Sequence, residues 1–576
     1  MLYPQSNPFR QSIDLSGFWD FRFDPDHLGT DQNWAVGFDS ARPIAVPASW
    51  NDQFEDNRDY LGDAWYQTKF DLPRGVDGQR LFLRFGSVNY LTEVWLNGER
   101  LGGHEGGHLP FEFEVTGKLK PEANRLVVRV NGDLAPDRVP PGDVMPDAED
   151  TFGGQQFPPT SFDFFPYCGI HRPVLLYSVP QTFIEDLTVL TDIRGRDGMV
   201  QVTVRAGQAR GPVRGMLRGF GTQVWAEVNV ENGEARFELV VPEAKFWSPK
   251  SPSLYELTVD LDGTDRYSLP VGIRTFRVDG ERLLLNGEPI YLTGFGRHED
   301  FPITGRGYLP AVIIKDYALM KWVGANSFRT THYPYSEQML DLADRLGFLV
   351  IDETPAVGLF FGADGLERRR ELCDQMTREM IARDKNHPSV IAWSLANEPH
   401  SARPVAKKFF RDLYDLAKRL DPTRPVTLVS YLGIMGEESF EFLDLICLNR
   451  YNGWYFLPGQ IDAGVKLVEA ELDGLHEMYP GKPFLLTEFG ADTFPGQHAQ
   501  PPEMFSEEYQ AEFLTAYIKL LRSKSYVAGE HVWNLCDFKT MQAVNRMNSY
   551  NYKGVFTRDR RPKLAAHCLR ELWKEQ

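Results

Sequence analysis

Two glutamates that end apolar runs of the sequence could share one reaction. Glu398 closes the apolar part of SVIAWSLANEPH, and Glu488 follows FLLT in the segment PFLLTEFGAD. A buried carboxylate is costly unless it is paired or used. One carboxyl group that donates a proton, facing another that attacks or activates water, is the pair that glycoside hydrolysis requires. The alternative is that each glutamate pairs with a basic side chain, and we favour that interpretation for Glu353 in VIDETP.

The region around the two glutamates, 274–576, predicts a (β/α)8 TIM barrel. Strand-like runs alternate there with amphipathic helices, and eight strand candidates occur. Glu398 ends the fourth candidate and Glu488 the seventh, so both would face one mouth at the carboxyl ends of the strands. An open doubly wound sheet would be expected to show a glycine-rich phosphate loop after an early strand, and the sequence has none.

The residues before the barrel read as β-structure in two blocks. Residues 1–180 contain short alternating segments such as LFLRFG, TEVWLNG and NRLVVRV, separated by Gly, Pro and Asn turns. Residues 181–273 contain FIEDLTVLTDI, MVQVTVRAG and LYELTVDL. We therefore expect a larger N-terminal β-sandwich, then a smaller immunoglobulin-like sandwich, then the barrel.

The glutamate segments resemble glycoside hydrolase family two. NHPSVIAWSLANEP is similar to the acid/base signature of that family, and LLTEFGAD is similar to its nucleophile segment. Members place a jelly-roll domain and an immunoglobulin-like domain before the barrel. The resemblance implies that Glu398 is the acid/base, that Glu488 is the nucleophile, and that Asn397 hydrogen-bonds the sugar 2-hydroxyl. It also implies retention, which needs carboxyl groups roughly 5–5.5 Å apart, and a Glu398 kept protonated by its proximity to Glu488.

A second resemblance concerns the substrate. In NRMNSYNYKGVFTRDRRPK, Asn551 and Lys553 resemble the Asn-x-Lys motif by which β-glucuronidases of this family hold the sugar carboxylate. Lysine supplies a point charge and asparagine an amide donor. A neutral sugar would leave both unpaired, a mismatch that can discriminate by ~10⁴-fold or more. The alternative is that Lys553 is one more solvated lysine.

Three more charged residues follow from the same resemblance. Asp163, in SFDFFPYCGIHRP, would reach from the first sandwich towards the sugar hydroxyls, and His332 would do so from strand two. Arg546 would join Lys553 near the carboxylate, although its interval to Asn551 is one residue longer than in enterobacterial-type enzymes. Asp163 could instead cap a turn, and His332 could be a core histidine.

Three aromatic residues complete the implied pocket. Tyr451 and Tyr455 would border it, with Tyr451 near the nucleophile, and Trp533 would form a wall. Tyr455 and Trp533 could also be ordinary core aromatics.

Composition excludes several classes of partner. The net charge of −18 argues against nucleic acid, and no stretch approaches the ~18 apolar residues of a membrane span. The start, MLYPQSNPFRQS, shows no signal peptide, and the five scattered cysteines predict reduced thiols, so we expect a cytoplasmic protein. No histidine spacing suggests a metal site, and no motif demands a cofactor.

The two resemblances together imply a retaining exo-β-D-glucuronidase that releases glucuronate and an aglycone. The alternatives are a β-galacturonidase or β-galactosidase of the same family, or a non-catalytic carbohydrate-binding protein. The substrate would be a small-molecule or oligosaccharide β-glucuronide. The resemblance also implies a homo-oligomer, either a dimer or a tetramer.

Overall fold

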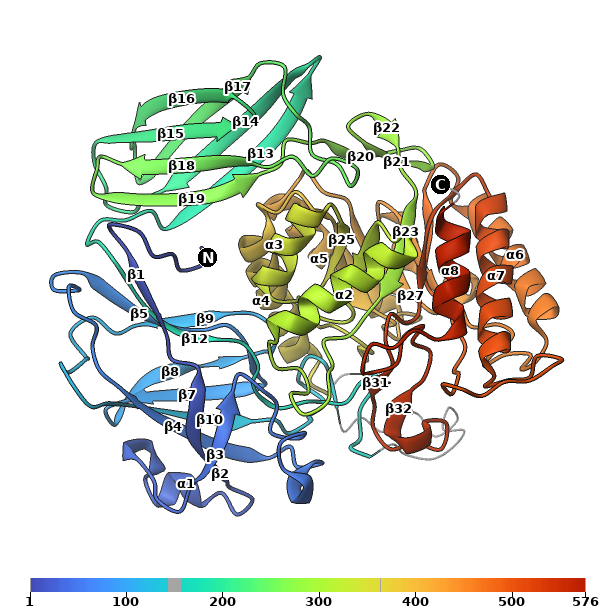
Figure 1. Ribbon diagram of the computed structural model, residues 1–576, viewed down its shortest axis with the longest axis horizontal. Helices are drawn as coiled ribbons and strands as arrows, with labels where there is room; N and C mark the ends of the chain where they lie inside the picture. The colour runs from blue at the N-terminus through green and yellow to red at the C-terminus, as the bar shows by residue number, and fades with distance from the viewer. Residues whose placement is uncertain (1, 143–156, 363, 575–576) are drawn as a thin grey trace.

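The computed structural model describes residues 2–142, 157–362 and 364–574. It contains two β-sandwiches followed by a closed barrel of eight parallel strands, so the predicted fold class is confirmed. In Figure 1 the first sandwich, in blue, and the second, in green, lie to the left of the barrel.

The first sandwich pairs a four-stranded sheet, in the order β1-β12-β5-β9, with a six-stranded sheet, β3-β2-β4-β10-β7-β8. Burial alternates along its strands: Thr92, Val94 and Leu96 of one strand are buried, and the residues between them are half-buried. That period of two places one face on the core between the sheets. The elements are β1 (Gln11–Asp14), β2 (Gly17–Phe23), α1 (Leu28–Asp31), β3 (Arg42–Val46), β4 (Asp63–Phe70), β5 (Arg80–Phe85), β6 (Val88–Asn89), β7 (Leu91–Leu96), β8 (Glu99–Glu105), β9 (Phe111–Glu114), β10 (Asn124–Asn131), β11 (Gly169–Ile170) and β12 (Val174–Val179).

The second sandwich packs a three-stranded sheet, β13-β14-β17, on a four-stranded one, β16-β15-β18-β19. The N-terminal residues are hydrogen-bonded to this second sandwich. Arg10 Nε donates to Asp265 Oδ1 over 2.8 Å, and the Tyr267 hydroxyl donates to the Tyr3 carbonyl over 2.9 Å. The strands, with the small sheet that leads to the barrel, are β13 (Asp186–Arg194), β14 (Asp197–Arg205), β15 (Pro212–Gly219), β16 (Thr222–Asn229), β17 (Glu234–Val241), β18 (Tyr255–Leu261), β19 (Asp265–Val271), β20 (Phe276–Asp279), β21 (Arg282–Leu285) and β22 (Glu288–Pro289).

The barrel strands coincide with the eight strand candidates of the sequence, and β23 pairs with β30 to close the ring. The strands are β23 (Leu292–Gly296), β24 (Ser327–Arg329), β25 (Leu349–Glu353), β26 (Val390–Asn397), β27 (Val426–Ser430), β28 (Ile446–Asn449), β29 (Phe484–Glu488) and β30 (Val527–Val532). The helices are α2 (Pro310–Val323), α3 (Glu337–Leu346), α4 (Leu366–Asp384), α5 (Pro404–Leu420), α6 (Ile461–Met478), α7 (Glu507–Ser523) and α8 (Leu564–Lys574). Two short strands, β31 (Phe538–Lys539) and β32 (Tyr550–Asn551), pair after β30.

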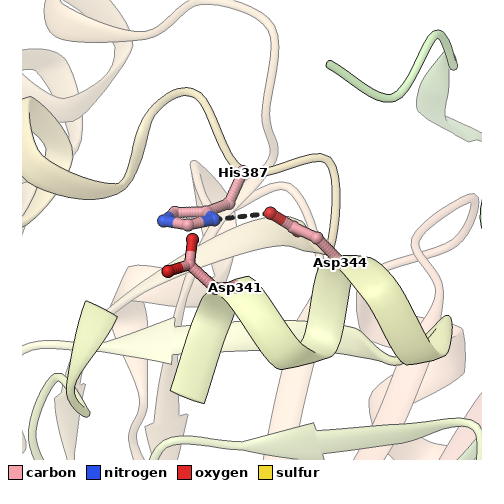
Figure 2. A group of neighbouring side chains, drawn as sticks. All are labelled: Asp341, Asp344 and His387. Carbon is pink, nitrogen blue, oxygen red and sulfur yellow. Dashed lines mark hydrogen bonds and ion pairs between the residues drawn. The ribbon is translucent and has the colours of Figure 1, made fainter. Parts of the chain in front are cut away.

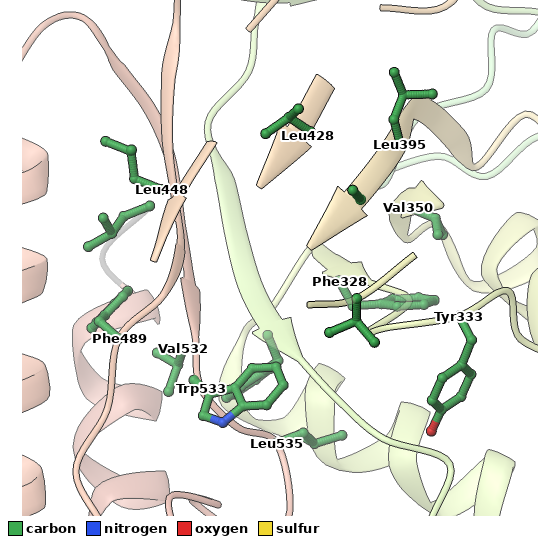
Figure 3. Packing of buried hydrophobic residues seen from close by; sticks show 14 of the residues in the cluster. Phe328, Tyr333, Val350, Leu395, Leu428, Leu448, Phe489, Val532, Trp533 and Leu535 are labelled. Carbon is green, nitrogen blue, oxygen red and sulfur yellow. The ribbon is translucent and has the colours of Figure 1, made fainter. Parts of the chain in front are cut away.

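Strand periodicity decides which side chains enter the barrel. Leu349 and Ile351 of β25 belong to a cluster at the barrel floor that also contains Trp247. Val350, between them, belongs to the larger cluster of strand and helix residues, part of which Figure 3 shows. Because successive side chains on a strand point to opposite faces, Glu353 lies on the inner face above Ile351.

Local signals set the ends of α3, the helix between β24 and β25. The Ser336 hydroxyl accepts the backbone N–H of Met339 and caps the first turn. Gly347 ends the helix with a φ of 78°, and a Cβ there would lie 2.5 Å from the Pro249 carbonyl oxygen. Glycine is therefore needed where the helix end meets the second sandwich.

The first sandwich is fixed against the barrel by charged contacts. Arg84 pairs with Glu337 of α3 over 2.5 Å, and both are buried. Asp52 accepts from Lys539 over 2.7 Å and from Arg558 over 2.8 Å, both from the segment that follows β30. These contacts hold the sandwich next to the carboxyl ends of the barrel strands. Among the described helices, none has the length and apolar character to span a membrane.

The strand–helix layer yields a stability prediction. Phe328 of β24 is fully buried and packs against Tyr317 of α2 (Figure 3 labels Phe328). Its substitution with alanine should lower the free energy of unfolding by about 3–5 kcal/mol. Urea unfolding followed by tryptophan fluorescence measures the change. The matched control is Ile314→Ala on α2, whose side chain is exposed and whose loss should cost about 0.5 kcal/mol or less. Equal effects of the two variants would contradict the assigned packing.

Candidate active site

The two glutamates lie at the carboxyl ends of strands four and seven of the barrel. Glu488 is the last residue of β29, and Glu398 directly follows β26. Glu398 has a φ of 46°, in the left-handed region that non-glycine residues rarely adopt. Its backbone N–H donates to the Val429 carbonyl over 2.8 Å, which fixes this unfavourable conformation. Strain of this kind is typical of functional sites.

Two donors contact the Glu488 carboxylate, and a histidine lies close to it. Arg329 donates to Oε1, and the Tyr451 hydroxyl donates to Oε2 over 2.7 Å. His332 Nε2 lies 3.6 Å from Oε1. The guanidinium charge and the phenol both stabilise the ionised carboxylate.

The Glu398 carboxylate and the Asn397 amide share one partner. Asn449 Nδ2, at the end of β28, donates to Glu398 Oε1 over 2.7 Å and to Asn397 Oδ1 over 3.2 Å. Arg329 Nη1 also lies 3.3 Å from Asn397 Oδ1. Arg329 and Asn449 therefore connect the ends of the two glutamate-bearing strands.

Burial is the main influence on the pKa values of Glu398 and Glu488. Burial raises the pKa of Glu398. Burial likewise raises the pKa of Glu488, to about 8, with Arg329 opposing the rise and the Glu398 carboxyl adding to it. The sequence led us to expect proximity as the main cause, and burial is instead the larger one. The pair keeps one proton near neutral pH, and we assign it to Glu398 because Arg329 and Tyr451 both donate to Glu488.

His332 is held as a neutral imidazole. Its Nδ1 lies 2.8 Å from Glu353 Oε1, and its ring stacks on Trp533 with centroids 5.1 Å apart. Burial lowers the pKa of His332 to about 4, so the ring is uncharged at pH 7. Glu353 also pairs with Arg329 over 2.7 Å, which confirms the prediction that this strand-end glutamate has a basic partner.

Five of the predicted residues form what we call the cation group: Asp163, Tyr455, Arg546, Asn551 and Lys553. Arg546 makes two 2.7 Å hydrogen bonds to the Asp163 carboxylate. Asn551 Nδ2 donates to the same carboxylate over 2.7 Å. The Tyr455 hydroxyl accepts from Lys553 over 2.8 Å and from Arg546 over 2.9 Å. Asp163 thus reaches the barrel from the first sandwich and pairs there, instead of capping a turn.

The cation group adjoins the glutamates. The rings of Tyr451 and Tyr455 are 5.3 Å apart, and Lys553 Nζ lies 5.6 Å from the Tyr451 ring centre. All eleven residues selected from the sequence therefore gather at one mouth of the barrel. Their roles towards a substrate stay predictions.

Comparison with known families covers nearly the whole chain. Residues 13–180 match the sugar binding domain of glycosyl hydrolases family 2, residues 182–274 match a further domain of that family, and residues 276–576 match its TIM barrel domain. The chain belongs to glycosyl hydrolase family 2.

Two relatives and two solved structures similar to this family 2 enzyme are all described as beta-glucuronidases. This enzyme is 42% identical to a beta-glucuronidase of Paenibacillus borealis, over 100% of this chain and 99% of the relative. It is 38% identical to the dog (Canis lupus familiaris) beta-glucuronidase, over 100% and 92%. The solved beta-glucuronidase of an uncultured Clostridium sp. superposes with a TM-score of 0.93 at 39% identity, over 100% of both chains. A Ruminococcus gnavus b-glucuronidase in complex with D-glucaro-d-lactam gives 0.93 at 37%, over 99% of both.

Sequence reasoning missed three residues of the family 2 site. Arg329 bridges carboxylates from two strands, Asn449 contacts Glu398, and Asp492 accepts from Lys553. Arg329 and Asn449 end the second and sixth barrel strands, so the strand-end rule that selected the glutamates could have found them. Asp492 lies four residues after Glu488, beyond the end of β29, so the strand-end rule would not have selected it.

One group of potential metal ligands occurs among the described residues: Asp341, Asp344 and His387 (Figure 2). His387 Nδ1 lies 2.6 Å from Asp344 Oδ2, and although burial opposes it, Asp344 raises the pKa of His387 to about 9. Asp344 and His387 therefore form an ion pair in this structure. It precedes β25 and β26, at the opposite end of these strands from Glu398.

Because Arg329 is buried between two carboxylates, its replacement should lower the stability of the protein. Arg329→Met should lower the free energy of unfolding by about 3–5 kcal/mol, because the Glu353 and Glu488 carboxylates lose their shared cation. Denaturant titration at pH 7 measures the change. The matched control is Arg378→Met, which breaks an exposed pair with Asp374 and should cost under about 1 kcal/mol. A loss below about 1 kcal/mol in both would contradict a compensating role for Arg329.

Proposed function

We propose that this family 2 enzyme is an exo-acting retaining β-D-glucuronidase that cleaves β-D-glucuronides to glucuronate and an aglycone. The observation that carries the proposal is the cation group beside the glutamate pair. Lys553 and Arg546 are buried, at 1% and 9% exposure, and both donate to the Tyr455 hydroxyl, so two cations converge where the carboxylate of a uronide would bind. The beta-glucuronidase names of the relatives support the same conclusion.

Cleavage of the glycosidic bond uses the two carboxyl groups in sequence. Glu398 gives its proton to the leaving oxygen while Glu488 attacks the anomeric carbon, so the aglycone departs and a glycosyl-enzyme ester forms. Glu398, now ionised, removes a proton from water, which attacks the same carbon and releases Glu488. Two inversions give net retention. Arg329 and Tyr451 orient the Glu488 carboxylate for the attack. They stabilise its negative charge again when the ester is hydrolysed.

The carboxylate of the sugar would meet cations that already have partners. Lys553 pairs with Asp492, and Arg546 pairs with Asp163. The Asn551 amide, which the sequence predicts to donate to the sugar carboxylate, donates to Asp163 when no ligand is bound. Buried charges need partners when no ligand is bound, so the aspartates hold these donors in position. The Tyr455 hydroxyl, shared by both cations, marks the point between them where an anionic oxygen would be most stabilised.

The proposal extends to location and assembly. We propose the cytoplasm as the site of action, which the free thiol state of all five cysteines supports. A dimer or tetramer is proposed on the family resemblance alone.

The experiment that tests the function is release of p-nitrophenol from the β-D-glucuronide, the β-D-galacturonide and the β-D-galactoside. Wild type should turn over the glucuronide. Glu488→Gln should lower kcat/KM by more than about 10⁴-fold, because the nucleophile is lost. Lys553→Ala should lower it by roughly 10²–10³-fold, since truncating one partner of a buried charge pair costs about 2–5 kcal/mol. Proton NMR of the first product should show the β-anomer of glucuronate.

Controls separate this function from its alternatives. Lys466→Ala, at an exposed position of α6, should leave kcat/KM within about twofold of wild type. Faster turnover of the galacturonide would assign the enzyme to that uronide, and turnover of the galactoside alone would refute the role of the cations. Sugar binding without turnover of any substrate would favour the carbohydrate-binding protein.

The shared proton predicts a pH profile. Activity needs Glu398 protonated and Glu488 ionised, so kcat/KM should fall at alkaline pH, where the pair loses the proton that burial helps it to keep. Asn449→Ala removes a hydrogen bond that lowers the pKa of Glu398, so the alkaline limb should move to higher pH. A profile from pH 5 to 10 with the aryl glucuronide measures both. An alkaline limb that stays in place, or moves to lower pH, in Asn449→Ala would contradict the assignment of the proton to Glu398.

A further inference from the structure

A cavity of about 400 Å³ lies where the second sandwich meets the base of the barrel. One wall comes from β13, β14 and the segment around Arg274, and the other comes from the loops just before β26 and β27. Those loops are at the amino ends of the barrel strands. The cavity is therefore at the opposite end of the barrel from Glu398 and Glu488.

Hydrogen bonds between the two domains build the cavity walls. Asn386, before β26, accepts from the Val189 N–H over 2.9 Å and donates to the Leu187 carbonyl over 2.9 Å. Lys385 pairs with Asp186 over 2.5 Å. The sandwich strand β13 is thus held beside the barrel loop, and the space next to it is bounded on both sides by fixed backbone.

The charges lining the cavity are unbalanced. Four basic residues and one acidic residue line it: Arg274, Arg277, Lys385, Arg424 and Asp192. Three of the cations have a carboxylate partner, with Arg424 pairing to Asp421 over 2.7 Å and Arg277 lying 3.4 Å from Asp192. Within the described ranges, no carboxylate lies within 4 Å of the Arg274 guanidinium. The lining therefore carries excess positive charge.

Arg274 is the cation that lacks compensation. It is 6% exposed, and its Nε and Nη2 donate to the carbonyls of Pro388 and Val390 over 3.0 and 2.7 Å. Burial, together with the neighbouring Arg424, lowers the pKa of Arg274 to about 9, although the more distant Asp421 and Asp344 carboxylates oppose the shift. An anion in the cavity would stabilise this buried guanidinium, which has only backbone carbonyls as hydrogen-bond acceptors.

We propose that this cavity binds a small organic anion, with a carboxylate or phosphate group against Arg274. Its volume is in the range of about 300–1,000 Å³ typical of ligand sites. Met199, Val271 and Pro388 give the cavity an apolar side for the rest of such a molecule. A bound anion would contact both the second sandwich and the barrel. The proposal is independent of the reaction at the other end of the barrel.

The test compares two anions and one neutral probe by isothermal titration calorimetry on the full-length protein. The probes are 4-bromobenzoate for the carboxylate, phenyl phosphate for the phosphate, and benzyl alcohol, in buffers of equal ionic strength. At least one anion should bind, and benzyl alcohol should not. Arg274→Gln should weaken anion binding tenfold or more. Arg196→Gln, an exposed arginine of the same sandwich outside the cavity, should leave it unchanged.

The active site is itself cationic, so Lys553→Ala is the second comparison. Anion binding that survives Lys553→Ala and is lost in Arg274→Gln supports the proposal. The reverse pattern, or equal binding of benzyl alcohol, overturns it. If Arg274→Gln fails to fold, crystals of wild type soaked in 4-bromobenzoate decide the question. A bromine anomalous peak beside Arg274 supports the site, and a peak only beside Lys553, or none, refutes it.

Discussion

The rest of the site depends on the two buried ion pairs that Arg329 makes with carboxylates. One guanidinium, fully buried, joins Glu353 and Glu488, so the ends of β24, β25 and β29 are held together by charge. The same group contacts Asn397, and Glu353 in turn orients His332. A cation in this position is stable only because two carboxylates surround it. Those carboxylates are tolerated only because the cation is there.

The mouth of the barrel is a set of buried charges that already have partners before any substrate arrives. Lys553 and Arg546 each have an aspartate, and the glutamate pair keeps one proton. The carboxylate of a uronide entering this site would contact cations that already have carboxylate partners. No cation would have to be newly buried. Positioned groups of this kind need little reorganisation during reaction, which is the main source of electrostatic stabilisation in enzymes.

Much of the fold and part of the site follow from sequence. Hydrophobic alternation and the strand–helix pattern predicted the three domains and all eight barrel strands, because these depend on local periodicity. The strand-end rule found Glu398 and Glu488. It could not show that Asp492 neutralises Lys553 or that burial outweighs proximity in setting the pKa of the pair. Those facts depend on distances between residues far apart in the chain, as does the unbalanced charge of Arg274.

The contact between Asp163 and Arg546 joins the first sandwich to the barrel within the cation group. A barrel excised from this chain would keep both glutamates yet leave Arg546 and Asn551 without the carboxylate that orients them. The first sandwich therefore cannot be exchanged as an independent module. Any recombination of the domains of this chain must therefore keep Asp163 and Arg546 together, because this part of the site is a joint property of two domains.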